Sequence, residues 1–151
     1  MAQPKINDKA PEFKGVTQTG ETISLSDFKG KKLILYFYPK DNTSGCTAEA
    51  QNLAENYDKL KASGYEVVGV SPDSVKSHQK FSEKYQLPFP LIADTEKEIL
   101  KAYDVWGEKK MYGRTYMGVK RTTFIINEDG KIEKIIDKVK TKDHTNQILN
   151  Q

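Results

Sequence analysis

The sequence predicts an α/β protein in which a mixed central sheet carries helices on both faces. Short apolar runs alternate with amphipathic stretches along most of the chain, which favours parallel strands joined by helices. An Asp129-Gly130 turn then joins two strand-like runs, which favours an antiparallel hairpin in the same sheet. The chain contains no repeat, low-complexity tract or Pro/Gly-rich linker, so we expect residues 1–151 to form a single domain.

Two segments in the first half carry strong patterns. The continuous apolar run at 33–38 predicts a strand that is buried on both faces. Apolar residues then recur at spacings of three and four from residue 46 to residue 60, which predicts an amphipathic helix with Ser44 as its N-cap. The expected elements are an irregular segment at 1–21, a short strand at 22–25, a turn at 26–30, a strand at 33–38 and a helix at 46–63.

Prolines and glycines divide the second half into shorter elements. Three glycines and the lack of a clear period predict a loop over residues 105–118. The other expected elements are a strand at 66–70, a helix at 74–85, a short strand within 88–93, a helix at 95–103, strands at 119–126 and 131–139, and a terminal helix at 143–149.

Cys46 is the only cysteine, and its isolation excludes several kinds of site. One thiol cannot form a disulfide within the chain, a Cys-x-x-Cys redox pair or a structural zinc site of several cysteines. The two histidines add no metal-ligand cluster, so we expect neither a metal nor another cofactor. His78 and His144 lie among polar residues, and we expect both rings to be solvated.

Charge and hydropathy limit the partners and the compartment. The chain has 24 basic and 21 acidic residues, and its net charge of +3 is too small to indicate a polyanionic partner. Basic and aromatic side chains do interleave over residues 106–121, but the weak charge leads us to expect no nucleic-acid partner. The longest apolar run is far shorter than the roughly 18 residues of a membrane span, and the N-terminus lacks an apolar signal region. We therefore expect no membrane partner. With a lone thiol, these features predict a cytoplasmic protein.

Cys46 also stands where a thiol becomes reactive. A buried strand runs into a loop, and the loop opens a helix that carries Cys46 in its first turn. Free backbone N–H groups and the positive end of the helix dipole stabilise thiolates at such positions. Thr43 can direct a hydroxyl toward the same pocket, and Pro39 ends the strand and shapes the loop. A packing role for Cys46 on the apolar stripe of its helix is the alternative.

The residues around Cys46 match a known motif. Pro39-x-x-x-Thr43-x-x-Cys46, after an aromatic strand, resembles the active-site motif of the peroxiredoxins. Residues 43–47 and 107–114 resemble the bacterioferritin-comigratory, or Q-type, subgroup, and the similarity covers nearly the whole chain. The resemblance implies a thioredoxin-like fold, with Cys46 as the peroxidatic cysteine. It further implies that the Cys46 thiolate attacks a hydroperoxide, becomes a sulfenic acid and releases water or an alcohol.

The same resemblance assigns further residues. The family requires an arginine on a later strand, and Arg121 takes that position; with Thr43 and the backbone N–H at the thiol it would stabilise charge along the breaking O–O bond. From the residues alone, an arginine at the solvent end of a strand is the alternative. Phe37 and Tyr38 are expected to wall the substrate pocket, although core packing explains them as well. Glu49 can orient Arg121, but we favour its interpretation as a charge near the start of a helix.

The chain departs from many Q-type members at one position. Where they carry a resolving cysteine, five residues after the peroxidatic one, this chain has Gln51. The resemblance then implies that an external thiol reduces Cys46, and thioredoxin, glutathione and a cysteine of a partner protein remain open. A peroxide sensor or redox relay, which passes its oxidation to a partner protein, would show the same features and is the alternative function. Q-type members are often monomeric, and we expect a monomer.

Overall fold

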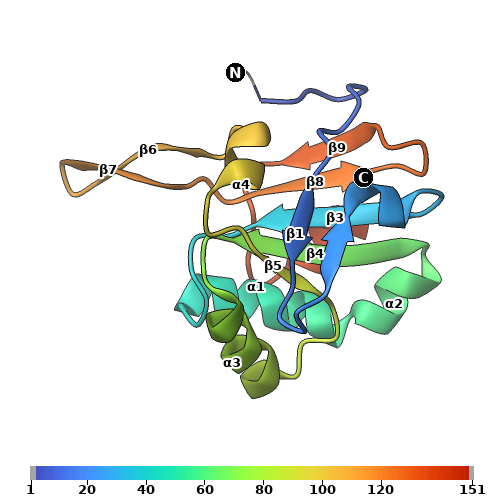
Figure 1. Ribbon diagram of the computed structural model, residues 1–151, viewed down its shortest axis with the longest axis horizontal. Coiled ribbons are helices and arrows are strands. Elements are labelled where there is room, and N and C mark those ends of the chain that lie inside the picture. The colour runs from blue at the N-terminus through green and yellow to red at the C-terminus, as the bar shows by residue number, and fades with distance from the viewer. Residues whose placement is uncertain (1–2, 150–151) are drawn as a thin grey trace.

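The computed structural model describes residues 3–149 and shows a five-stranded mixed sheet with helices on both faces (Figure 1). The strand order is β5-β4-β3-β8-β9; β3 pairs with β4 in parallel and with β8 antiparallel. The strands of this sheet are β3 (Lys32–Phe37), β4 (Tyr65–Ser71), β5 (Leu91–Ala93), β8 (Thr122–Ile126) and β9 (Ile132–Ile136). The mixed α/β architecture predicted from the sequence is confirmed.

The helices divide between two core clusters, one on each face of the sheet. Helices α1, α2, α3 and α5 contribute buried side chains to one cluster, and α4 contributes to the other. Their bounds are α1 (Ser44–Glu55), α2 (Tyr57–Ala62), α3 (Val75–Tyr85), α4 (Glu98–Ala102) and α5 (His144–Leu149). No helix among residues 3–149 is long and apolar enough to cross a membrane.

Strand β3 separates the two clusters. All residues from 33 to 38 are buried, as the apolar run predicts. Because successive side chains of a strand point to opposite faces, Leu35 and Phe37 join the cluster of α4. Tyr36 and Tyr38 join the other cluster, which also contains Cys46. This alternation decides which aromatic rings lie near the thiol.

Two predicted elements are each divided by a break. The helix predicted at 46–63 is two helices, interrupted at Asn56, whose side-chain amide donates to the carbonyl of Asn52 at 2.8 Å. Thr43 occupies the N-cap of α1, so the prediction of Ser44 is wrong by one residue. The strand predicted at 119–126 is also divided, which leaves Lys120 and Arg121 between two strands.

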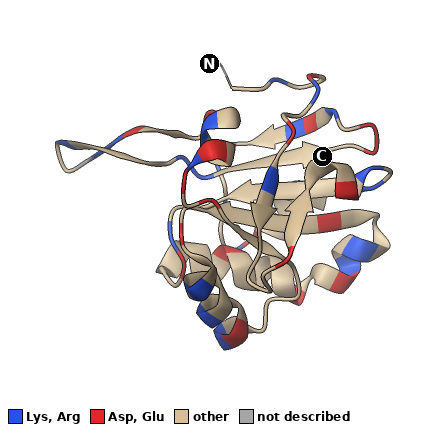
Figure 2. Cartoon of the chain, viewed as in Figure 1, with Lys and Arg blue, Asp and Glu red and all other residues tan. Residues whose placement is uncertain are grey.

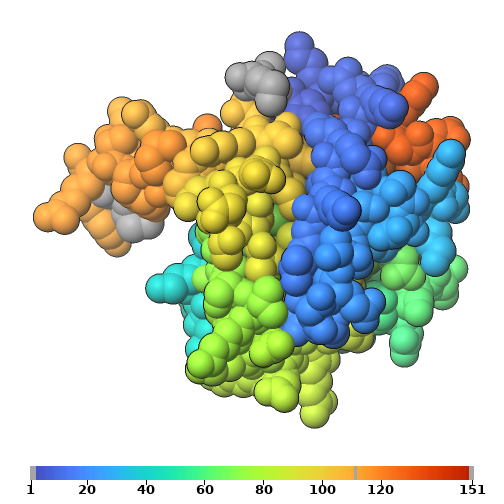
Figure 3. Space-filling model, viewed as in Figure 1, coloured from blue at the N-terminus to red at the C-terminus, as the bar shows by residue number. Residues whose placement is uncertain are grey.

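The loop predicted at 105–118 is instead a hairpin that projects from the body (Figures 1 and 3). Strands β6 (Trp106–Met111) and β7 (Arg114–Val119) pair antiparallel around the Tyr112-Gly113 turn. Both turn residues have positive φ, 53° and 77°, as a tight hairpin turn requires. The loop prediction is wrong because the glycines serve the turn and the ladder rather than an irregular segment. The hairpin leads directly into Arg121.

The N-terminal segment is more regular than the sequence suggests. The part predicted to be irregular contains β1 (Lys14–Val16), which pairs antiparallel with β2 (Thr22–Ser24). The turn predicted at residues 26–30 is instead a 3-10 helix, η1 (Leu25–Phe28). Basic and acidic positions are interspersed along the chain in Figure 2, in keeping with the small net charge.

Candidate active site

Cys46 lies in the first turn of α1 and is almost fully buried, with 1% of its surface exposed. The first intrahelical hydrogen bond runs from the Thr47 N–H to the Thr43 carbonyl at 2.8 Å. The Cys46 N–H precedes that bond, in the part of a helix where backbone donors point outward. The thiol therefore sits at the positive end of the helix dipole, as predicted from its position in the sequence.

Arg121 reaches the thiol from the connection between β7 and β8. Its Nη2 donates to Cys46 Sγ at 3.3 Å, although the two residues are 75 positions apart in the chain. Gly45 leaves room for this approach, because a Cβ there would lie 3.2 Å from Arg121 Nη2. The structure thus places the predicted arginine in contact with the predicted nucleophile. The alternative, in which Arg121 is a solvated residue at the end of a strand, does not fit this contact.

Glu49 holds the other side of the guanidinium. Its Oε1 accepts from Arg121 Nη1 at 2.6 Å, and its side chain is fully buried. Burial raises the pKa of Glu49 to about 7, while the charge and hydrogen bond of Arg121 limit the rise. The favoured interpretation, a charge near a helix start, is therefore wrong, and the orientation of Arg121 is the role that the contacts fit.

Thr43 and Pro39 shape the loop ahead of the helix. The Thr43 hydroxyl donates to the carbonyl of Lys40 at 2.9 Å, so its proton is engaged and its oxygen lone pairs remain for an acceptor role. Pro39 is half-buried and directly follows the buried strand segment. Both residues thus belong to the connection that ends at Cys46.

Comparison with known proteins identifies the family. Residues 6–135 match the model of the AhpC/TSA family. The chain belongs to the AhpC/TSA family, as a peroxiredoxin. Peroxiredoxin Bcp of Bacillus subtilis (strain 168) is 46% identical to it over 96% of this chain and 92% of that protein. Peroxiredoxin Bcp of Escherichia coli (strain K12) is 42% identical over 97% of this chain and 94% of that protein.

Solved structures place this peroxiredoxin in the Q-type group that its motifs resemble. A cysteine-to-serine variant of PrxQ from Xylella fastidiosa superposes with a TM-score of 0.92 at 34% identity, covering 99% of this chain and 96% of that one. Peroxiredoxin Q of Xanthomonas campestris has a TM-score of 0.87 at 34% identity, covering 97% of this chain and 92% of that one. The resemblance and the thioredoxin-like fold are confirmed, and this peroxiredoxin carries a single cysteine.

The two aromatic residues expected at the pocket fall on different faces of the sheet. Phe37 packs against Tyr103 and Phe124 in the cluster opposite the thiol, so the structure does not bring it to Cys46. Tyr38 shares the cluster of Cys46. Sequence analysis missed Tyr36, which also shares that cluster and has a buried hydroxyl with no hydrogen-bond partner among the described residues. The period-2 alternation of the strand was the signal that could have found it.

Both histidines of this peroxiredoxin are fully buried, so the prediction that they are solvated is wrong. His144 packs beneath the active site, with Nε2 2.8 Å from Thr123 Oγ1 and 3.5 Å from Glu49 Oε2. The polar residues around it in the sequence gave no sign of burial, which arises from the docking of α5, the helix that carries His144, against α1.

His78 anchors the active-site loop from the other side. Its Nδ1 lies 2.6 Å from Asp41 Oδ2, and its Nε2 donates to the carbonyl of Ile92 at 2.9 Å. Asp41 also accepts from the hydroxyl of Tyr38 at 2.6 Å. Asp41, Asp73 and His78 hold three ligand-type atoms within 4.8 Å, but hydrogen bonds inside the cluster already engage these groups. The cluster fixes the loop that precedes Cys46.

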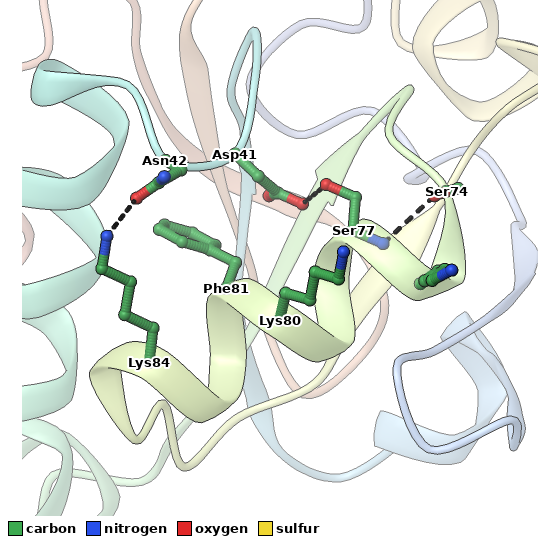
Figure 4. A pocket seen from close by; sticks show the side chains of 8 residues that line it. Asp41, Asn42, Ser74, Ser77, Lys80, Phe81 and Lys84 are labelled. Carbon is green, nitrogen blue, oxygen red and sulfur yellow. Dashed lines mark hydrogen bonds between the residues drawn. The ribbon is translucent and has the colours of Figure 1, made fainter.

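A pocket of about 410 Å³ lies beside this loop, against α3 (Figure 4). Its lining residues are Asp41, Asn42, Ser74, Lys76, Ser77, Lys80, Phe81 and Lys84. Lys84 Nζ donates to Asn42 Oδ1 at 3.4 Å across the pocket. Neither Cys46 nor Arg121 lines it, so this hollow and the reactive thiol are separate features of the surface.

Proposed function

We propose that this peroxiredoxin reduces hydrogen peroxide and organic hydroperoxides at Cys46, with an external thiol as the reductant. The contact between Arg121 Nη2 and Cys46 Sγ, at 3.3 Å, carries the proposal. A guanidinium cannot deprotonate in a protein, so it supplies a permanent positive charge and a directed donor to the sulfur. Peroxiredoxins at 42–46% identity over nearly the whole chain support the same activity.

The first half of the cycle oxidises the thiol. The Cys46 thiolate attacks one oxygen of ROOH, the O–O bond breaks, and Cys46 becomes a sulfenic acid while RO⁻ leaves. A proton taken up from water completes ROH, which is water when the substrate is hydrogen peroxide. The sulfur gives up two electrons and the peroxide gains them.

Three groups of this chain assist that displacement. Arg121 and the backbone N–H of Cys46 donate toward the negative charge that grows along the breaking bond. The Thr43 oxygen can accept the O–H of the hydroperoxide, because its own proton is donated to Lys40. Pro39 positions the loop that carries Thr43. Tyr38 lines the thiol's side of the sheet, and Glu49 holds Arg121 in place.

The second half of the cycle requires another molecule. Gln51 stands where a resolving cysteine would be, and the chain has no second thiol. An external thiol R′SH attacks the sulfenic acid, forms a mixed disulfide with Cys46 and releases water. A second R′SH then attacks the mixed disulfide, which regenerates the Cys46 thiol and releases R′SSR′.

We also propose that residues 1–151 act as one monomeric domain in the cytoplasm, without a nucleic-acid or membrane partner. The five-stranded sheet, which both core clusters share, supports one domain. The lone free thiol fits a reducing compartment, and the small net charge supports the lack of a polyanionic partner. Light scattering that gives a mass well above the 17.1 kDa of the chain would contradict the monomer.

Peroxide consumption by the wild type and by Cys46→Ser tests the activity. The thioredoxin system, the glutathione system and a small synthetic dithiol are offered separately, so the same experiment identifies the reductant. We expect turnover in the wild type with at least one reductant and none in the variant. Oxidation of Cys46 without turnover under any reductant would instead favour the redox relay, and equal consumption by the variant would refute the role of Cys46.

A further inference from the structure

We propose that His144 is a positioning residue for the catalytic arginine and acts through the buried carboxyl of Glu49. The inference rests on the proposed function of Cys46 and Arg121 and extends it to the C-terminal helix. Glu49 is the link, because one of its oxygens binds Arg121 and the other faces His144. Nothing in the chemistry of the thiol itself requires a histidine at this place.

The free oxygen of Glu49 is the first observation. Oε1 accepts from Arg121 at 2.6 Å, whereas Oε2 is buried and has no hydrogen bond within the described residues. The nearest charged or titratable partner recorded for Oε2 is His144 Nε2, at 3.5 Å. Both side chains are 0% exposed. A buried carboxylate oxygen without a partner is costly, so this pair needs a proton or a donor between its atoms.

The hydrogen bonds around His144 show which of its ring nitrogens carries the proton. Gln147 Oε1 accepts from the Lys140 N–H at 2.8 Å, which identifies it as the amide oxygen. His144 Nδ1, at 2.9 Å from that oxygen, therefore carries a proton and donates it. In the neutral ring, Nε2 is then the lone-pair nitrogen, with the Thr123 hydroxyl at 2.8 Å and Glu49 Oε2 at 3.5 Å. These two groups compete for its single lone pair.

A single proton shared by Glu49 Oε2 and His144 Nε2 would give the buried carboxyl oxygen a hydrogen-bond partner. Placed on Glu49 Oε2, it takes the lone pair of His144 Nε2 in place of the Thr123 hydroxyl; placed on Nε2, it is shared between the carboxylate at 3.5 Å and Thr123 Oγ1 at 2.8 Å. Either arrangement leaves the pair with no net charge and keeps Oε2 turned toward His144. Arg121 then meets only Oε1, and its second nitrogen stays on Cys46 Sγ.

Other charged groups around the pair favour the proton on Glu49. Burial raises the pKa of Glu49 to about 7, although Arg121 opposes this. Burial lowers the pKa of His144, as do Arg121 and Lys134, while the hydrogen bond to Gln147 raises it. Tyr36 faces the same region from β3, and burial and Glu49 raise the pKa of its phenol, so it stays neutral. Cys46 supplies the remaining charge when it is a thiolate.

Loss of the His144 contact should redirect Glu49. A carboxylate with both oxygens free binds an arginine through two parallel hydrogen bonds. That bidentate geometry would draw Nη2 from Cys46 Sγ to Glu49 Oε2. The thiol would lose its donor while the fold and the arginine were still present.

Two substitutions in the full-length protein separate this role from packing. His144→Asn keeps an amide where Nδ1 donates to Gln147 but has no atom at the position of Nε2. His144→Gln places an amide near the position of Nε2, where it can donate to Glu49 Oε2. Thr145→Val is the matched control on the same helix, since Thr145 Oγ1 bonds the Asn52 carbonyl and not Glu49.

The measurement is the second-order rate constant of Cys46 with hydrogen peroxide across pH, with thermal unfolding of each variant as a check on folding. We expect His144→Asn to lower the rate constant at pH 7 about tenfold, the effect of losing one hydrogen bond to a charged group. His144→Gln should recover most of the rate, and Thr145→Val should leave it unchanged. In a Glu49→Gln background, His144→Asn should cause no further loss, because its route to Arg121 is already removed.

Three results would overturn the inference: a wild-type rate in folded His144→Asn, equal impairment by Asn and Gln, or the same loss in the Glu49→Gln background. The wild type in the same assay tests the proposed function separately. If the wild type does not react with peroxide, the activity at Cys46 is wrong; if it reacts and the variants behave alike, only the role of His144 is wrong.

Discussion

Replacing Arg121 with lysine would separate the charge of this residue from its geometry. Arg121 donates to Cys46 Sγ at 3.3 Å and to Glu49 Oε1 at 2.6 Å from two different nitrogens. Lysine keeps the charge but has one nitrogen on a flexible stem, so it cannot hold both contacts in one plane. We expect the ammonium to bind Glu49, because a buried carboxyl without a partner is the more costly loss.

The size of the effect follows from the contact that lysine would abandon. Removing one fixed donor to a developing negative charge slows catalysis by about 10²–10³-fold, or about 3–4 kcal/mol of activation free energy. The Arg121 side chain is 23% exposed, so water can replace part of the lost hydrogen bond. We therefore expect Arg121→Lys to lower the rate constant by about 100-fold.

The assay is competition between this peroxiredoxin and a reporter peroxidase for limiting hydrogen peroxide. It reports the oxidation step alone, so the identity of the reductant does not enter. Lys120→Ala is the matched control, because it removes the exposed charge next to Arg121 and leaves the Arg121 donor on Cys46 Sγ in place. A rate constant for Arg121→Lys close to that of the wild type would show that charge alone suffices and would refute the geometric argument.

Three further predictions follow from the same site. Excess hydrogen peroxide without a reductant should convert Cys46 to the sulfinic acid, since the chain has no second thiol to trap the sulfenic acid; intact-mass spectra that show only reduced protein would contradict this. Asp41→Ala removes the acceptor shared by several buried donors and should lower the free energy of unfolding by about 3–5 kcal/mol in denaturant titrations. A change below about 1 kcal/mol would mean that the loop does not depend on this cluster. Glu49 should make the folded protein less stable as the pH rises, because burial raises its pKa from the ordinary 4.5 to about 7 in the fold, so the unfolded chain releases a proton that the fold retains. The stability of the wild type relative to Glu49→Gln should therefore fall by up to about 3 kcal/mol from about pH 4.5 to about pH 7, and a constant difference would disprove an elevated pKa.

Local patterns account for much of what could be predicted. The apolar run of β3, the helix start at Cys46 and the Asp129-Gly130 turn depend on neighbouring residues, and all three are present in the structure. The hairpin of β6 and β7 was missed because it has no clear apolar period and most of β7 is exposed, so that only cross-strand pairing makes it regular. Phe37 was placed at the pocket although the alternation along its strand already pointed it to the other face.

The environment of the thiol depends on segments that are distant in sequence. The place of Glu49 one turn after Cys46 favours its interpretation as a charge near a helix start, and polar neighbours favour a solvated ring for His144. Both are buried where α5, which carries His144, docks on α1, which carries Glu49. No local pattern could have predicted their approach, since it arises from the packing of two sequence-distant helices on the same face of the sheet.

The sequence by itself predicted the candidate nucleophile, the strands and most of the helices of the central sheet and, through the family resemblance, the need for an external thiol. The first two depend on composition and on neighbouring residues, such as one cysteine at one helix start, and the third depends on the resemblance, which marks Gln51 as standing in place of a second thiol. Only the tertiary structure decided what surrounds that nucleophile. It brought Arg121 into contact with the Cys46 sulfur, 75 positions away in the chain. It also paired Glu49 with Arg121 and placed His144 next to the other oxygen of that carboxyl. The physical reason is burial: once α1 and α5 exclude water from one face of the sheet, these polar groups can be satisfied only by one another.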